Sequence, residues 1–130
     1  MCIRDRLWTV HPDGSNETAL YANNMVFPEA ILDARPVPGS GLIVGTLAKH
    51  NAPPRGSLAF LDPAQGKNEP RALSNLEHPD QPTFDRGESC EPWPLSADAV
   101  VFSGRGGGAA RSRIELMLSL IHISEPTRPY

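Results

Sequence analysis

Turn-forming residues interrupt this chain at short intervals, and their spacing leaves room only for short regular elements. The 130 residues include 14 prolines and 11 glycines. A proline in the interior of a helix costs about 3 kcal/mol, so the chain disfavours long helices. Strong turn sequences occur at Pro12-Asp13-Gly14, at Pro38-Gly39-Ser40-Gly41 and at 62–66, where proline fixes φ and glycine accepts a positive φ. We therefore expect an all-β chain.

The segments between the turns have the composition of short strands. Residues 7–11 and 17–22 flank the Pro-Asp-Gly turn and predict a β-hairpin. Residues 42–48 are apolar enough to be a strand buried on both faces. The remaining expected strands are 33–37, 57–61, 69–73, 91–96 and 99–103. Residues 74–90 read as a polar loop.

The strand-and-turn pattern repeats. Trp8 to Gly14 and Leu58 to Gly66 are both strands that enter proline-centred turns, and Pro12 and Pro63 are 51 residues apart. Propeller blades are repeats of about 40–50 residues with four antiparallel strands each. The pattern predicts an incomplete β-propeller of about two to three blades.

The two ends of the chain differ in origin from the rest. Residues 1–6 resemble the translation of the mosaic-end sequence used in transposase-based DNA libraries, and residues 118–128 resemble its opposite strand read into a primer site. We expect 1–6 and 118–130 to be adapter-derived and unstructured, and 7–117 to be a fragment of a longer protein. Without Cys2, the sole native cysteine is Cys90, so no intrachain disulfide is expected.

Charge and hydropathy exclude two classes of partner. The chain has 12 Lys and Arg against 15 Asp and Glu, a net charge of −3, whereas a nucleic-acid surface needs clustered positive charge. No apolar run approaches the roughly 18 residues of a membrane span. We therefore expect neither a nucleic-acid partner nor a membrane span.

The stretch from Trp8 to Ser103 resembles the middle domain of the hydrazine synthase alpha subunit and its relatives, a TolB-like β-propeller family of environmental bacteria. The residues that carry the resemblance are Leu7-Trp8-Thr9-Val10, Pro12-Asp13-Gly14-Ser15, Tyr21-Ala22-Asn23-Asn24, Asp33-Ala34-Arg35-Pro36-Val37-Pro38-Gly39-Ser40, Ile43-Val44-Gly45-Thr46 through His50, Gly56-Ser57-Leu58, Leu61-Asp62-Pro63 with Gly66, and Pro92-Trp93-Pro94-Leu95-Ser96.

This resemblance implies a non-catalytic binding or scaffold module within a larger periplasmic or exported protein. Its partners would be the remaining blades and neighbouring domains, and any c-type haem would lie in those domains, because this chain has no Cys-x-x-Cys-His sequence. The alternative is part of a catalytic subunit resembling hydrazine synthase alpha, a haem-dependent oxidoreductase. Fold alone does not decide between them.

Four residues are candidates for ligand binding or for lining a channel. His50 follows a buried strand and is either a proton-transfer group or metal ligand, or a loop histidine bonded to backbone. Asp33 and Arg35 share one face of a strand, since side chains alternate, and either line a polar channel or serve in an ion pair or in loop capping. Glu91 occupies the comparable start of the next repeat. No catalytic residue and no metal site is assigned.

The glycine-rich segment Gly104–Gly108 leaves a weaker alternative open. A strand, a glycine loop and a helix together form a dinucleotide-binding fingerprint, which would make this a nucleotide-binding α/β domain. The other interpretation is a glycine-rich hairpin loop. A helix after Gly108 would favour the former.

Overall fold

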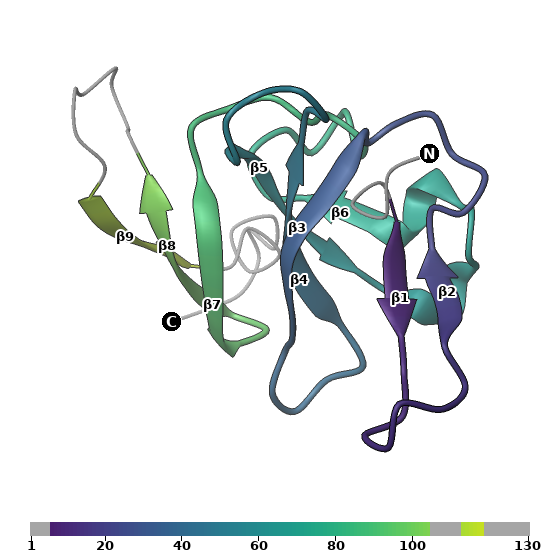
Figure 1. Cartoon of the computed structure of the whole chain (residues 1–130). Helices are drawn as coiled ribbons and strands as arrows, with labels where there is room; N and C mark the ends of the chain where they lie inside the picture. Colours follow the sequence, from purple (N-terminus) through teal and green to yellow (C-terminus); the bar gives the residue numbers. More distant parts are fainter. Residues whose placement is uncertain (1–5, 105–112, 119–130) are drawn as a thin grey trace.

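The computed structural model describes residues 6–104 and 113–118, and these residues form three antiparallel sheets side by side (Figure 1). The first sheet has strand order β1-β2, the central sheet β3-β4-β5-β6 and the third sheet β7-β8-β9. Apart from two short 3-10 helices, all the described regular elements are strands. The all-β expectation is confirmed.

The first sheet is the predicted hairpin. Its strands, β1 (Leu7–Thr9) and β2 (Thr18–Tyr21), are shorter than expected. The connecting turn is closed by Asp13, whose carboxylate accepts hydrogen bonds from the Ser15 amide at 2.9 Å and hydroxyl at 2.6 Å. These bonds lower the pKa of Asp13. Gly14 adopts φ 85°, the positive value that the turn sequence predicts.

The central sheet is a meander in which each strand pairs with the next. Its strands are β3 (Ala30–Pro36), β4 (Ile43–Ala48), β5 (Gly56–Leu61) and β6 (Leu73–Asn75). Five of the six residues of β4 and all six of β5 are buried, which confirms the prediction that the 42–48 segment is covered on both faces.

The outermost strand of the central sheet is displaced from the predicted position. Residues 69–73 were expected to form it, but η3 (Pro70–Ala72) is a 3-10 helix and β6 begins only at Leu73. Pro70 has no amide to donate to a strand partner, and the Glu69 carboxylate caps the helix by accepting from the Arg71 amide. A second 3-10 helix, η2 (Pro63–Gln65), is capped in the same way by Asp62.

The third sheet consists of β7 (Cys90–Ser96), β8 (Ala99–Gly104) and β9 (Arg113–Leu118). β9 pairs antiparallel with β8 over its whole length, from Gly104 opposite Arg113 to Ala99 opposite Leu118. A helix after Gly108 would have favoured the α/β alternative. Residues 105–112 lie outside the described residues, and residues 113–118 form a strand, which corrects the expectation of a helix there. Leu118 was expected to be unstructured but ends this strand, whereas 1–5 and 119–130 lie outside the described residues.

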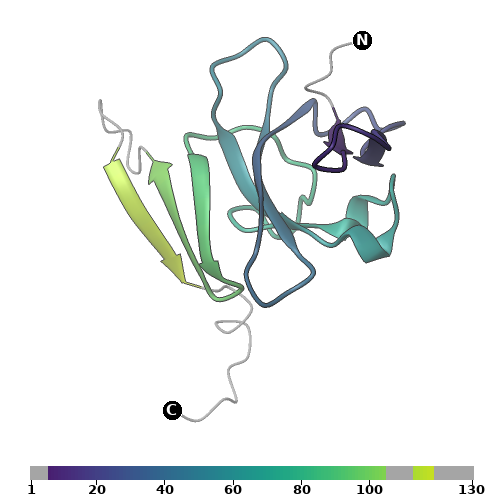
Figure 2. The ribbon, with the colours of Figure 1, turned by 60° about the horizontal axis from the view of Figure 1, so that its bottom comes forward.

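Both faces of the central sheet are buried, each against a different neighbour (Figure 2). One cluster joins it to the first sheet and the other joins it to the third. The first cluster consists of Tyr21, Ala22, Leu47, Ala59, Leu61, Ala72 and Leu73. The second consists of Val37, Val44, Leu58, Phe60, Leu76, Val100 and Phe102. The alternation of strand side chains accounts for this division, since Leu58 belongs to the second cluster and the next residue of β5, Ala59, belongs to the first.

The third sheet buries one face and exposes the other. Val100 and Phe102 belong to the second cluster, and the residue between them, Val101, lies opposite Trp93 and Leu116 on the neighbouring strands. Trp93 is 56% exposed and Leu116 is 59% exposed. We call this surface the outer face of the third sheet.

Candidate functional site

Three loops meet at one end of the central sheet because of the strand register. Ala48 at the end of β4 pairs with Ala30 at the start of β3 and with Gly56 at the start of β5. Gly56 also forms a bridge with Ser89, just before β7. The loop 49–55, the loop 76–89 and the residues that precede β3 therefore lie next to one another.

Side chains fix the loop 76–89 against the start of β5. The carboxylate of Glu77 accepts a hydrogen bond from the Leu58 amide and another from the Ser89 hydroxyl, each at 2.8 Å. The Ser57 hydroxyl donates to the Arg86 carbonyl at 2.6 Å. Leu58 and Ser57 are fully buried, so these bonds replace hydration that the groups lose on folding.

Two glycines permit close backbone approaches at the start of β5. A Cβ at Gly56 would collide with the Leu47 carbonyl, and a Cβ at Gly87 would lie 2.6 Å from the Gly56 carbonyl oxygen. Gly87 also has φ 144°, a conformation that other residues rarely adopt. Gly56 therefore permits the close approach of β4 and β5, and Gly87 permits the backbone contact between the loop 76–89 and β5.

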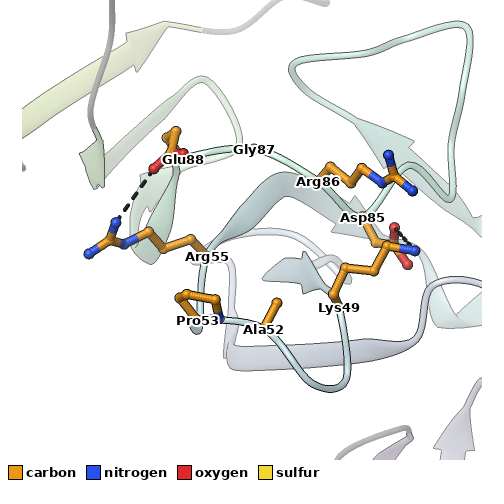
Figure 3. Close-up of a pocket in the computed structure, with 8 residues that line it drawn as sticks. All are labelled: Lys49, Ala52, Pro53, Arg55, Asp85, Arg86, Gly87 and Glu88. Carbon is orange, nitrogen blue, oxygen red and sulfur yellow. Dashed lines mark ion pairs between the residues drawn. The ribbon is translucent and has the colours of Figure 1, made fainter. Parts of the chain in front are cut away.

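A pocket of about 200 Å³ lies between the two loops (Figure 3). We call it the loop pocket, and its lining residues are Lys49, Ala52, Pro53, Arg55, Asp85, Arg86, Gly87 and Glu88. An ion pair stands at each end, with Arg55 Nη1 3.5 Å from Glu88 Oε2 and Lys49 Nζ 3.8 Å from Asp85 Oδ1.

Lys49 is shared between two carboxylates. Its ammonium donates to Glu29 Oε2 at 2.6 Å, and this hydrogen bond lowers the pKa of Glu29. Asp85 is 5% exposed, and its other oxygen accepts from the Glu29 amide at 3.1 Å. The lysine therefore ties the beginning of β3, the end of β4 and the loop 76–89 together.

His50 lies beside the loop pocket and not within its lining. Its amide donates to Glu29 Oε1 at 3.4 Å, and its side chain helps to line a separate hollow with Met25, Val26, Glu29 and Asn51. Among residues 6–104 and 113–118, no group of three or more His, Cys, Asp and Glu side chains is placed to hold a metal ion.

Asp33 and Glu91 occupy matching positions in two sheets. Each lies in a bulge of the first strand of its sheet, with φ 53° and 52° respectively, and the register shifts between Leu32 and Arg35 and between Cys90 and Trp93. The bulge interrupts the simple alternation that placed Asp33 and Arg35 on one face, which corrects that premise.

The structure brings Arg35 to the third sheet. Its guanidinium lies over the indole ring of Trp93, 4.4 Å from the ring centre, so its observed partner is an aromatic ring. Burial raises the pKa of the Cys90 thiol, and a hydrogen bond with Ser103 opposes this effect.

The sequence did not indicate Lys49, Arg55, Asp85 and Glu88 as parts of one site. They lie in two loops that are far apart in the chain, and the loops meet through tertiary contacts such as the bridge from Gly56 to Ser89. The available signal was the pair of glycines flanked by charged residues, Arg55-Gly56 and Arg86-Gly87-Glu88.

Comparison with known proteins adds no relative to this description, since no family model, no curated protein and no solved structure matches the chain. The site is therefore interpreted from its own geometry. Within the described parts of the chain, no helix has the length and hydropathy needed to cross a membrane.

Proposed function

We propose that this chain is part of a β-propeller that serves as a non-catalytic binding or scaffold module in a larger exported protein. The observation that carries the proposal is the repeated bulge. Asp33 and Glu91 stand 58 residues apart, each at positive φ in the first strand of a sheet, and each is followed two residues later by a side chain of the Arg35–Trp93 stack.

The order of the strands fits this repeat. The central sheet would be a complete four-stranded blade, the third sheet would supply the first three strands of the next blade, and β1 and β2 would be the outer two strands of the preceding one. The turn after β1 and the turn after β5 are then equivalent, which agrees with the 51-residue spacing of Pro12 and Pro63.

The exposed apolar surface of the third sheet is consistent with packing against a further blade. Trp93 occupies the position in the repeat of β7 that Arg35 occupies in β3. Arg35 packs against the neighbouring third sheet through its contact with Trp93. The outer face of the third sheet would be covered by the next blade in the way that the central sheet covers its inner face. Exposed apolar patches of this kind usually mark an interaction surface.

A binding role agrees with the chemistry of the loop pocket better than a catalytic one. Lys49, Arg55, Asp85 and Glu88 stand in ion pairs at the two ends of the pocket. Fixed charges at the rim of a pocket suit the recognition of a charged ligand.

Long-read sequencing of the gene, anchored on codons 7–117, tests the proposal. We expect a full reading frame with a signal peptide and further copies of the bulge pattern. In each copy, an acidic residue would stand two positions before an arginine or aromatic residue and three positions before a proline. A frame without such copies contradicts the propeller. Cys-x-x-Cys-His motifs in that frame, with haem-dependent oxidoreductase activity of the expressed protein, would favour the catalytic subunit.

A further inference from the structure

One edge of β9 has no strand beside it among the described residues. β9 pairs with β8 along its whole length on one edge, and residues 6–104 and 113–118 supply no strand to the other edge. β5, the third strand of the central sheet, has β6 at the equivalent edge. β9 stands on the side of the third sheet that is farthest from the central sheet (Figure 1). The backbone amides and carbonyls of such an edge are a template for a further strand.

The side chains of β9 make this edge apolar on one face. Ile114, Leu116 and Leu118 alternate along the strand and share the outer face of the third sheet, where they are 83%, 59% and 62% exposed. Met117, on the opposite face, packs against the second cluster. No proline and no bulge interrupts β9, so it lacks two of the devices that keep natural edge strands from pairing.

Twofold symmetry limits the ways in which two copies of β9 can pair. An antiparallel pair related by a twofold axis perpendicular to the sheet places residues of the same face opposite each other. In the register centred on Leu116, each Leu116 faces its own copy, and each Ile114 faces the Leu118 of the other chain. Glu115 then lies opposite Met117. The outer face gains three apolar cross-strand pairs, which are the units that stabilise a sheet.

The other symmetric registers are less favourable. A register centred on Glu115 places two carboxylates directly opposite each other, and like charges in this position are destabilising. Registers centred on Ile114 or Met117 overlap only over residues 113–115 or 116–118 of the described strand, against 114–118 for the register centred on Leu116. Charge and overlap therefore both favour Leu116 as the centre.

We propose that β9 binds a second copy of this chain by antiparallel pairing centred on Leu116, which joins two three-stranded sheets into one continuous sheet. In the proposed propeller, the fourth strand of the blade would take this edge, so the second copy occupies a position that the sheet offers to a strand. The pairing uses only residues of β9 and does not require the propeller. Gene sequencing and the pairing experiment therefore fail independently of each other.

Cysteine cross-linking tests the pairing and its register. The full 130-residue chain, with Cys2→Ser and Cys90→Ser, is fused to a cysteine-free soluble carrier and oxidised with copper phenanthroline. Leu116→Cys should form a disulfide-linked dimer, because directly opposite Cβ atoms lie about 4.5–5.5 Å apart. Ile114→Cys alone should cross-link at least about tenfold more slowly, since its own copy is offset by about 13 Å along the strand.

A mixture of two variants provides a second test of the register. Ile114→Cys chains mixed with Leu118→Cys chains should form the disulfide that Ile114→Cys chains alone do not form. Val26→Cys is the matched control, because Val26 is 76% exposed but lies outside β9, and it should remain monomeric under the same oxidation. Circular dichroism verifies that each variant keeps the β-sheet spectrum of the parent chain.

Two results would overturn the proposal. Absence of a Leu116→Cys dimer would mean that another segment of the chain, or no strand at all, occupies this edge. Equal cross-linking of Leu116→Cys and Ile114→Cys would mean that the chains associate without a defined strand register.

Discussion

At the scale of single residues, two glycines and two ion-paired carboxylates determine the geometry of the site. The Leu47 carbonyl lies where a Cβ of residue 56 would be, and the Gly56 carbonyl lies close to where a Cβ of residue 87 would be. Glu29 and Asp85 then attach their segments to Lys49. All of these contacts lie within the described residues.

Gly56→Ala should destabilise the fold by about 3 kcal/mol, because the added methyl group meets backbone on the adjacent strand and forces the strands apart. Gly41→Ala is the control, since its Cβ would meet nothing within 4 Å, and it should change stability by less than about 0.5 kcal/mol. Urea denaturation followed by circular dichroism measures both. Similar midpoints for the two variants would show that β4 and β5 approach each other less closely than described.

The pairing of Glu29 with Lys49 predicts a pH dependence of stability. The pKa of Glu29 is lowered in the folded state, so the stabilisation is present above the ordinary glutamate pKa and is lost as the pH falls through the lower, folded-state value. The difference in unfolding free energy between the parent chain and Glu29→Gln should be largest near neutral pH and should shrink on acidification. Glu17→Gln, an exposed site, is the control. A difference that does not change with pH would exclude the ion pair as its cause.

At the scale of elements, the turns were predictable and the irregular strand positions were not. The Pro-Asp-Gly hairpin and the doubly buried 42–48 strand follow from local sequence. The 69–73 segment was assigned wrongly because the cap at Glu69 and the proline at Pro70 override its strand composition. The bulges at Asp33 and Glu91 arise from pairing with β4 and β8, which a single strand sequence does not contain.

The loop pocket escaped prediction for a related reason. Residues 74–90 do read as a polar loop, yet what orders this segment is the contact of Glu77 with Leu58 and Ser89. These bonds join positions that are 12 and 19 residues apart. Sequence composition shows that a loop is present but not which strand it folds against.

Glu77→Gln should loosen the loop 76–89, because the neutral amide keeps a single acceptor oxygen for two donors and leaves one of them unpaired. We expect a loss of about 1–3 kcal/mol and faster hydrogen exchange at the Leu58 amide. Glu88→Gln, in the same loop but with a long and exposed ion pair, should leave that amide protected. Unaltered exchange at Leu58 in Glu77→Gln would mean that Glu77 does not hold the loop.

At the scale of the whole molecule, the central sheet is covered on both faces while the third sheet is covered on one. The outer face of the third sheet presents Trp93, Leu116 and Leu118, each more than half exposed. An apolar surface of this kind favours association in water. The chain on its own should therefore associate through this face.

Leu116→Glu should reduce this association, since a charge on the outer face opposes its burial against another chain. Val26→Glu is the control, because Val26 is 76% exposed but lies in the loop before β3. Sedimentation velocity at several concentrations measures the effect. A sharp monomer peak for the unaltered chain would contradict the prediction that the outer face needs a cover.

A crystal structure of the protein encoded by the full gene would show directly whether these sheets are propeller blades. We expect a four-stranded sheet on each side of the central sheet, one of them formed by extending the third sheet. We also expect a further sheet to pack on Trp93. Asp33 and Glu91 would then lie on neighbouring inner strands about a common axis. An outer face of the third sheet that is left to solvent, or that is covered by a helix, would contradict the propeller.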